Sequence, residues 1–335
     1  MDRIVVAFSH EEAQRRILRL LESAGCSPAA CCVSGGETIR TVRKLGGAVV
    51  VCGFKFRDMT ASEVAASLRD AAVLLVLLSA VLTVGVLFSL LGYILIRGIP
   101  QLTPSLFSLT YTTENVSMLP AILNTVTMTA LSLLLAVPLG VGSAIYLVEY
   151  AKRGNRLVEL VRLTAETLSG IPSIVYGLFG YLFFVIACKM GNSLLSGILT
   201  LTIMILPLIM RTTEEALKSV PDAYREGSFG LGAGRLRTVF CIVLPSAAPG
   251  ILAGVILGIG RIVGETAALI YTSGTVAGVP KSLMGSGRTL AVHMYALLSE
   301  GFYTEQAYAT AVVLLVMVVG INTLSAMVAK RVSVR

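Results

Sequence analysis

The chain has 335 residues, of which 55% are apolar and 14% are charged, and its formal net charge is +8. Ordinary soluble domains are about 45–50% apolar and about 25% charged, so the composition excludes a simple soluble enzyme, a disordered regulator and a disulfide-rich secreted domain. Charged residues are dense before residue 70 and sparse after it. This change predicts a small soluble segment followed by a membrane domain. We expect the excess of Lys and Arg to lie beside a lipid bilayer, with no nucleic acid as a partner.

Residues 1–70 alternate between strand-like and helix-like patterns. Short apolar runs predict strands and the segments between them predict helices, in the order 4–8, 11–21, 29–33, 36–45 and 48–54. This β-α-β-α-β order is typical of the first half of a doubly wound sheet. The segment resembles part of a response-regulator receiver domain, although Gly53 stands where a receiver carries its phosphorylated Asp. The resemblance therefore implies a receiver-like α/β fragment without phosphorylation chemistry.

Residues 71–335 predict an all-α membrane domain. Six apolar stretches are long enough to cross a bilayer; they cover about 71–96, 118–148, 163–188, 194–210, 247–271 and 307–329. With the N-terminus inside, the inner loops and the C-terminal tail hold twelve Lys and Arg residues, and the outer loops hold four. Because cytoplasmic loops are enriched in basic residues, this bias predicts that both ends of the chain are cytoplasmic.

The sequence indicates neither a metal site nor an ATPase. The six cysteines form no CxxC pair, and the two histidines, His10 and His293, are far apart in the chain. No Gly-x4-Gly-Lys-Ser/Thr phosphate-binding loop occurs. We therefore expect no metal, no cofactor and no ATP hydrolysis by this chain itself.

The segment between the fourth and fifth predicted spans carries the most informative pattern. Glu226, Gly227 and Ser228 are followed, after three residues, by Gly232 and, after nine more, by an Ile-Val-Leu-Pro run that ends at Pro245. Small side chains permit a short helix to lie close against another surface, and a glycine permits a turn with positive φ. The final proline is expected to mark the start of the next span.

This pattern resembles the EAA loop of ABC importer permeases, with residues 211–245 as the loop. The resemblance implies a short coupling helix at the cytoplasmic face that docks on an ATPase subunit, with the five motif residues involved in ATPase coupling. The alternative is a loop that only joins two spans. A loop of 35 residues with helical content is long for that purpose.

The whole membrane domain is similar to the phosphate importer permeases of that family, over about residues 72–331. The phrases that carry the similarity are residues 118–124, 136–140, 146–150, 170–177, 211–215 and 261–266. The similarity implies the ABC type I importer permease fold, with six transmembrane helices in a bacterial cytoplasmic membrane. It also implies a sister permease, an ATPase dimer, an extracytoplasmic phosphate-binding protein and phosphate as the transported molecule.

Two charged residues lie within the fifth predicted span. Arg261 and Glu265 are four residues apart, which places both on one face of a helix. A charge inside a bilayer is costly and normally faces a cavity or a partner, and a guanidinium is well shaped for an oxyanion. We interpret Arg261, Glu265 and the adjacent Thr266 as parts of a translocation path. The alternative is a structural ion pair that fixes helix packing.

Glu166 lies early in the third predicted span, and we place it on the same path. Its carboxylate is expected to pair with Arg162, four residues earlier, or with Arg261 across the bundle. A carboxylate at the end of a helix, beside the bilayer surface, is the alternative. Pro172 is expected to break this helix, because proline lacks a backbone N–H and clashes with the preceding turn.

Other patterns predict packing and exposure. A stripe of small residues runs along the fifth predicted span, at Gly250, Gly254 and Gly258. Such a stripe predicts close packing against another helix. Glu149 is expected in a solvated cluster at the membrane interface. The outer loop 272–306, which contains Arg288 and His293, is also expected to be solvated.

The sequence favours a permease subunit of an ATP-driven phosphate importer, which is a transport component rather than an enzyme. A secondary transporter or a channel for an anion would use the same intramembrane charges without an ATPase, but no inverted repeat is visible. A permease for another oxyanion, such as sulfate or molybdate, would need the same guanidinium. A signalling protein driven by the N-terminal segment is disfavoured by Gly53.

Overall fold

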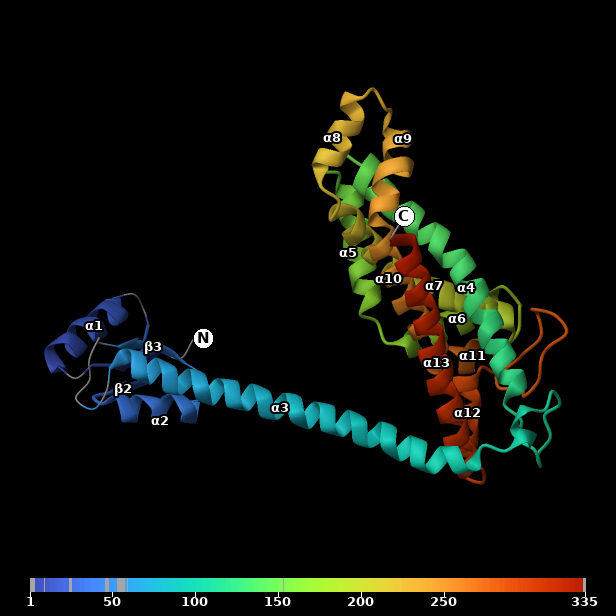
Figure 1. Cartoon of the computed structure of the whole chain (residues 1–335), viewed down its shortest axis with the longest axis horizontal. Helices are drawn as coiled ribbons and strands as arrows, with labels where there is room; N and C mark the ends of the chain where they lie inside the picture. The colour runs from blue at the N-terminus through green and yellow to red at the C-terminus, as the bar shows by residue number, and fades with distance from the viewer. Residues whose placement is uncertain are drawn as a thin grey trace. The chain divides into compact units, whose positions relative to one another are not determined.

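Figure 1 shows the computed structural model, which describes residues 4–8, 10–23, 26–45, 48–52, 58, 60–152 and 154–333. The chain divides into two units, residues 1–91 and 92–335. Gly53, on which the expectation about phosphorylation rests, lies outside the described residues. The receiver-like character of this segment therefore stays a prediction.

The first unit contains a three-stranded parallel sheet in the order β2-β1-β3. Its elements are β1 (Ile4–Ala7), α1 (Glu11–Ser23), β2 (Ala30–Cys32), α2 (Gly35–Leu45) and β3 (Val49–Cys52). In the central strand, Val5 is opposite Ala30 on one side and opposite Val50 on the other. The side chains of β1 from Val5 to Ala7 are fully buried, because this strand has a neighbour on each edge and packs against α1 and α2.

Helix α3 (Ala61–Gly98) begins in polar sequence and continues into apolar sequence. Its N-terminus has a capping box. The Glu63 carboxylate accepts the Thr60 backbone N–H at 2.7 Å, and the Thr60 hydroxyl accepts the Glu63 N–H at 3.3 Å. The backbone N–H of Thr60 and, to a smaller extent, its hydroxyl, which donates to the same carboxylate oxygen at 3.1 Å, lower the pKa of Glu63 below its ordinary value. The helix runs without interruption through residue 70, where the composition changes.

The second unit is a helix bundle. After the 3-10 turns η1 (Ile99–Gln101) and η2 (Pro104–Phe107), its elements are α4 (Leu119–Ile145), η3 (Tyr146–Tyr150), α5 (Arg156–Ser169), α6 (Ser173–Gly180), η4 (Tyr181–Ala187), α7 (Leu194–Lys218), α8 (Asp222–Gly230), α9 (Arg235–Thr238), η5 (Val239–Val243), α10 (Leu244–Val263), α11 (Ala267–Thr272), α12 (Leu290–Glu300) and α13 (Thr304–Ser333). The turns η3, η4 and η5 are π-helical.

Five helical segments of the described chain are long and apolar enough to cross a membrane. They are Val76–Gln101, Leu119–Tyr150, Leu194–Lys218, Arg235–Val263 and Thr304–Met327. A sixth candidate is the pair formed by α5 and the α6–η4 segment, whose axes differ by 105°. The expected membrane domain is thus present as a mostly helical bundle with five or six candidate spans.

The third predicted span, 163–188, is not one straight helix. It bends between Ser169 and Ser173, either as a broken span or as a re-entrant loop. Pro172 has extended backbone angles and caps α6. Because this proline has no N–H to donate to the preceding turn, the helix breaks at the place that the sequence predicted.

The fourth predicted span, 194–210, ends too early. Helix α7 continues to Lys218, because Thr213 and Leu217 on its last turns are still fully buried. An apolar contact surface holds the helix together beyond the point where its hydropathy falls. The first eight residues of the predicted loop 211–245 therefore belong to α7.

The fifth predicted span, 247–271, also differs from the structure. The continuous helical segment begins at Arg235 and ends at Val263, and Gly264 caps its C-terminus. Pro245 lies at the start of α10, as expected, although the continuous helical segment that contains it begins earlier, at Arg235. The π-helical turn η5 comes directly before α10, where Pro245 has no backbone N–H to donate to the preceding turn.

The glycine stripe of α10 packs against α7 within the same chain. A Cβ added at Gly254 would lie 2.7 Å from the Thr212 Cβ, and one added at Gly250 would lie 2.7 Å from the Ala216 Cβ. Both separations are shorter than van der Waals contact, so only glycine permits this approach. The predicted role of the stripe in helix packing is confirmed at these two positions.

We predict that Gly254→Ala lowers the thermal stability of the purified protein. The added methyl group overpacks the α7–α10 contact, which costs about 1–3 kcal/mol. Gly260→Ala is the matched control on the same helix, because a Cβ there meets no atom within 4 Å. It should leave the unfolding temperature unchanged or raise it slightly through helix propensity. Equal unfolding temperatures for the two variants would contradict this account of the packing.

Candidate functional site

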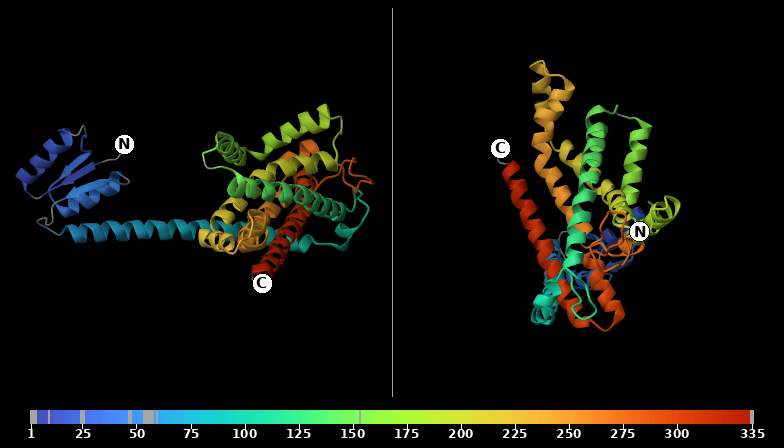
Figure 2. Two further views of the ribbon diagram at one scale, coloured as in Figure 1. Left: turned by 90° about the horizontal axis from the view of Figure 1, so that it is seen from above. Right: turned by 90° about the vertical axis from the view of Figure 1, so that its right-hand side faces the viewer.

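Helices α8 and α9 form a hairpin at one end of the bundle, opposite the end that holds α12 (Figure 1 and the right-hand view of Figure 2). We call this the α8 end. Pro221 precedes α8, and the chain reverses at Gly232, which has φ 80°. Glycine favours this left-handed conformation. The hydroxyls of Ser228 and Thr238 share a hydrogen bond of 2.8 Å and hold the two arms of the hairpin together.

The outer surface of the hairpin is open. Glu226 is exposed, and a Cβ added at Gly227 would meet no atom within 4 Å. Beside them, Tyr224, Phe229 and Leu231 are exposed apolar residues, and Leu231 is 91% exposed. We call these five residues the hairpin tip. Large apolar side chains that are exposed in this way are typical of a surface that binds another molecule.

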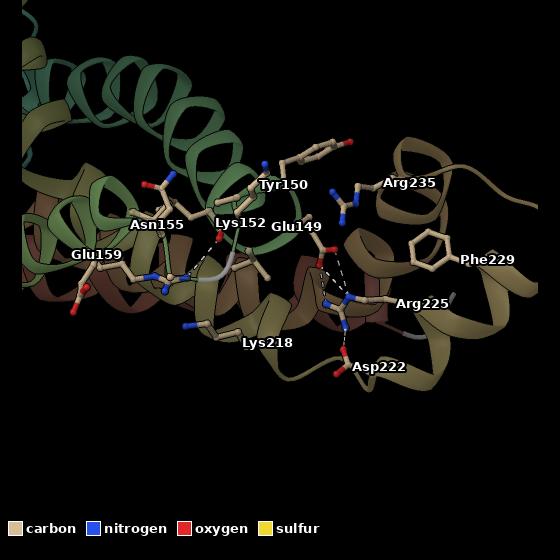
Figure 3. A pocket seen from close by; sticks show the side chains of 16 residues that line it. Glu149, Tyr150, Lys152, Asn155, Glu159, Lys218, Asp222, Arg225, Phe229 and Arg235 are labelled. Atoms are coloured by element: carbon tan, nitrogen blue, oxygen red, sulfur yellow. Dashed lines mark hydrogen bonds and ion pairs between the residues drawn. The ribbon is translucent and has the colours of Figure 1, made fainter.

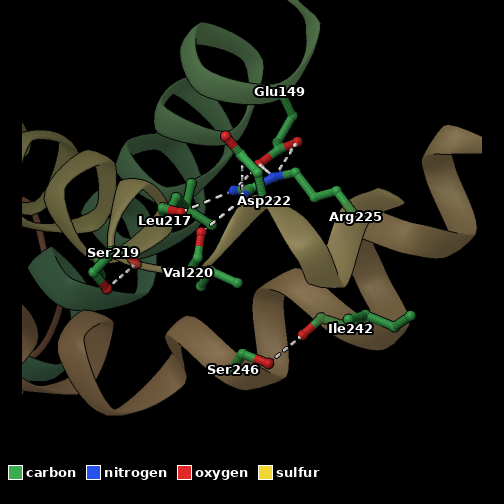
Figure 4. Close-up of polar contacts among 9 residues, drawn as sticks. Glu149, Leu217, Ser219, Val220, Asp222, Arg225, Ile242 and Ser246 are labelled. Atoms are coloured by element: carbon green, nitrogen blue, oxygen red, sulfur yellow. Dashed lines mark hydrogen bonds and ion pairs between the residues drawn. The ribbon is translucent and has the colours of Figure 1, made fainter. Parts of the chain in front are cut away.

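Arg225 holds the hairpin to the bundle (Figure 4). Its Nη2 and Nε donate to Oε1 of Glu149 at 2.8 and 3.1 Å. The Arg225 side chain is 14% exposed and the Glu149 side chain is 8% exposed. The expectation that Glu149 belongs to a solvated cluster is therefore wrong, because its charge is compensated by a guanidinium from a distant part of the chain.

A cavity of about 840 Å³ opens beside this ion pair, between η3, the start of α5 and the hairpin (Figure 3). Its charged lining residues are Glu149, Lys152, Glu159, Arg162, Lys218, Asp222, Arg225 and Arg235. The Arg235 guanidinium also lies 5.8 Å from the ring centre of Tyr150. Cations outnumber carboxylates in this lining, so the cavity is electropositive.

Further ion pairs join α5 to α7 near the α8 end. Glu214 binds Arg162 at 2.7 Å and Lys218 at 2.6 Å. Glu166 is 67% exposed and pairs with Arg211 at 3.6 Å. Glu166 was expected to pair with Arg162 or with Arg261, and both expectations are wrong. Arg162 lies against α7 and reaches Glu214 instead, which leaves Glu166 to the neighbouring arginine.

Arg261 and Glu265 do not form the ion pair that was the alternative to a translocation path. Arg261 lies half-buried in the last turn of α10, whereas Glu265 follows the end of that helix. The Glu265 carboxylate is buried and accepts the Ala268 backbone N–H at 3.1 Å, in the first turn of α11. Because Gly264 interrupts the helix, the four-residue spacing does not place the two side chains together. Arg261 makes no ion pair within the described part of the chain, and Thr266 lies half-buried between the two helices.

The end of the bundle that holds α12 is more buried than expected. Arg288 is 4% exposed and its guanidinium stacks 4.7 Å from the ring centre of Tyr111. His293, on α12, is fully buried and meets the same ring edge-on at 6.2 Å. Asn124 of α4 donates to the backbone carbonyls of Gly278 and Arg288 at 2.9 and 3.1 Å. The expectation of a solvated loop is wrong here, because these contacts fold the segment against α4.

The pairs that organise the α8 end were missed by the sequence analysis. Arg225 and Glu149 are 76 residues apart, and spacing rules join only residues on one helix. The remaining signal is that both charges border apolar spans, where an unpaired charge is costly. Among the residues that the structure describes, no group of three or more His, Cys, Asp and Glu side chains is arranged to hold a metal ion.

Comparisons with known proteins agree with this architecture. A family model described as "Binding-protein-dependent transport system inner membrane component" matches residues 136–334. The probable ABC transporter permease protein YqgI of Bacillus subtilis is 34% identical over 248 residues, which are 68% of this chain and 82% of that protein. The phosphate transport system permease protein PstA of Pasteurella multocida is 34% identical over 231 residues, covering 68% of this chain and 81% of that protein.

The fold is also similar to that of a solved transporter. The crystal structure of a bacterial alginate ABC transporter, in complex with an alginate pentasaccharide-bound periplasmic protein, contains a chain that matches with a TM-score of 0.61. The match covers 79% of this chain and 96% of that chain at 16% identity. The similarity therefore extends over nearly the whole of the solved chain and concerns the fold alone.

We predict that acidification destabilises the bundle through His293. Burial, together with the charge of Arg288, lowers the pKa of His293 from 6.5 to about 3. The unfolded chain therefore binds a proton below pH 6.5 that the folded chain does not bind, so stability is present above pH 6.5 and is lost as the pH falls toward 3. Unfolding temperatures at pH 7.5 and pH 5 should differ by the equivalent of about 2 kcal/mol through this group.

His293→Gln removes the titrating group and keeps a side chain of similar size. The variant should show a smaller decrease in unfolding temperature between pH 7.5 and pH 5 than the original protein. An equal decrease in both proteins would contradict the assignment of this pH dependence to His293.

Proposed function

Since the chain belongs to the family of binding-protein-dependent transport system inner membrane components, we propose that it is the membrane permease subunit of an ATP-driven phosphate importer, corresponding to PstA. The phosphate transport system permease of Pasteurella multocida, 34% identical over most of its length, supports phosphate as the transported molecule. As a permease, the chain is a transport component rather than an enzyme. ATP hydrolysis belongs to a partner subunit.

The hairpin tip is the observation that carries this function. A membrane protein that uses an ATPase must offer it a surface outside the bilayer. Here a short helix presents a free carboxylate, Glu226, an open glycine, Gly227, and the exposed side chain of Leu231. Ser228 and Gly232 shape the hairpin behind this surface, and Pro245 lies at the start of α10, where η5 leads from the hairpin into the bundle.

The assembly follows from this assignment. The hairpin tip binds one subunit of a PstB-like ATPase dimer, and a PstC-like sister permease completes the transmembrane pathway. An extracytoplasmic phosphate-binding protein delivers phosphate at the end that holds α12. The α8 end is then cytoplasmic, and we place both chain termini in the cytoplasm of a bacterium, with the bent pair α5–α6 as the sixth span.

We place the translocation path along the end of α10. Arg261 is a half-buried guanidinium without an ion-pair partner in the described chain, which leaves its donors free for an oxyanion. Glu265 and Thr266 follow Arg261 closely in the chain and lie at the break between α10 and α11. Glu166, which pairs with Arg211 near the α8 end, belongs to the inner mouth of the path.

Two alternatives remain distinct from this proposal. A secondary transporter or an anion channel would move phosphate without ATP, and it would not need the exposed surface at the hairpin tip. A permease for another oxyanion would use the same subunits and the same Arg261. Sulfate and molybdate are therefore the competitors to include in transport measurements.

We predict that Glu226→Lys weakens ATPase binding by about tenfold or more. It reverses a charge at the centre of the proposed contact, where a few residues carry most of the binding energy. The measurement is the affinity between the purified permease heterodimer and the ATPase. Glu305→Lys reverses an exposed carboxylate at the first turn of α13, far along the chain from the hairpin, and should leave this affinity unchanged. Equal affinities of the two variants for the ATPase would show that the hairpin tip is not part of the ATPase contact.

We predict that Arg261→Ala reduces ATP-dependent uptake of labelled phosphate by about tenfold or more, since it removes charge-assisted hydrogen bonds to the anion. Uptake is measured in proteoliposomes that contain both permeases and the ATPase, with binding protein and excess sulfate or molybdate added outside. Lys189→Ala removes an exposed cation and is the control. Full uptake by Arg261→Ala would mean that this residue has only a structural role. Phosphate uptake without the ATPase would favour a secondary transporter. Inhibition of phosphate uptake by sulfate or molybdate would favour another oxyanion as the substrate.

A further inference from the structure

Every N–H of the Arg225 guanidinium is directed to a partner, and the partners lie on three elements (Figure 4). The pair with Glu149 reaches η3, at the end of α4. Nη2 also donates to the carbonyl of Leu217 at 2.9 Å, and Nη1 donates to the carbonyl of Val220 at 2.8 Å. The remaining contact is from Nη1 to Asp222 at 3.2 Å, on α8 itself. One side chain therefore joins α8, the C-terminal end of α7 and the end of α4.

These contacts form a stiff connection. The guanidinium is planar and makes two hydrogen bonds to one carboxylate oxygen, which restricts rotation of α8 as well as its translation. The two side chains are only 14% and 8% exposed, so water competes with this pair much less than with an ion pair at the surface. By contrast, the ion pairs of Arg211 nearby are about half exposed, and water readily exchanges with them.

Arg225 lies between the hairpin tip and α4, so this connection joins the exposed surface to the bundle. Glu226 and Gly227 follow Arg225 directly in the chain and are exposed. Ser228 is the buried residue on the same helix, and its hydroxyl bonds to Thr238 of α9 rather than to α4. A force applied at the hairpin tip therefore reaches α4 through Arg225 and Glu149, and reaches α10 through the hairpin backbone.

We propose that Arg225 and Glu149 form the link that passes movement of α8 to α4 when the partner ATPase changes conformation. This inference rests on the proposed function of the hairpin as an ATPase contact. Arg225 is a positioning residue in this role, because it acts on the translocation path by way of α4 and binds no transported anion. The link keeps α8, η3 and the end of α7 together as one rigid group during transport.

The first experiment measures phosphate taken up per ATP hydrolysed in proteoliposomes of the complete transporter. Arg225→Lys keeps the charge but loses the paired donors, and Glu149→Gln keeps the shape but loses the charge. Each change should lower the ratio of phosphate to ATP at least tenfold, while the ATPase still copurifies and hydrolyses ATP. The double variant should be no worse than either single variant, because all three remove the same link.

The matched control is Arg235→Lys. Arg235 is a guanidinium on the same hairpin that contacts Tyr150 and forms no ion pair in the described chain. This variant should keep the original ratio of phosphate to ATP. The proposal is overturned if Arg225→Lys and Glu149→Gln lose uptake only in proportion to lost assembly, or if the losses add in the double variant. Either result would make the pair a structural contact.

The second experiment does not depend on phosphate. Spin labels are placed at Ala223 on α8 and at Leu139 on α4, in a chain whose exposed cysteines Cys26, Cys31, Cys188 and Cys241 are replaced by serine. ATP binding to the complex should leave the distance between the labels unchanged in this chain and should change it after Arg225→Lys. A change without that substitution would overturn the link. If the complex takes up no phosphate but the label distances behave as expected, the proposed substrate fails and the link stands.

Discussion

Close approach of glycine backbones to α7 is the constraint that fixes the rest of the bundle. Helices α4 and α10 both pack on α7, and a Cβ added at Gly140 of α4 would lie 2.8 Å from Cγ2 of Ile209. Gly254 has the same relation to Thr212 from the other helix. Because α7 is held in this way along its apolar part, the direction of its last turns is fixed. They present Glu214 to Arg162 of α5 and the Leu217 carbonyl to Arg225 of the hairpin.

The sequence was informative wherever one residue type has one structural consequence. The spacing of the hairpin motif, the break at Pro172 and the glycine stripe each depend on local backbone chemistry, and the structure has the break and the packing where they were expected. Charge partners were not predictable in this way. Glu149 and Glu166 both take a partner from another helix, and such pairings depend on helix ends that hydropathy places only approximately.

The break between α10 and α11 separates two charged residues, Arg261 and Glu265, that are four residues apart in the sequence. Glu265 uses its carboxylate to cap α11 through the Ala268 N–H, and this contact satisfies a buried charge locally. Arg261 keeps its charge without a carboxylate in the described chain. Gly264, which ends α10, is therefore the residue that makes a free guanidinium possible. A straight helix would have placed the two opposite charges side by side and neutralised them.

The exposed apolar residues of the hairpin tip also affect how long an unassembled subunit survives in the cell. Leu231 is almost completely exposed, and Tyr224 and Phe229 of the same hairpin are exposed as well. A newly made chain that has not met its partner carries this patch into water, where chaperones and proteases recognise such surfaces. Copies made in excess of the partner would then be removed, and the abundance of the partner would set the number of surviving subunits.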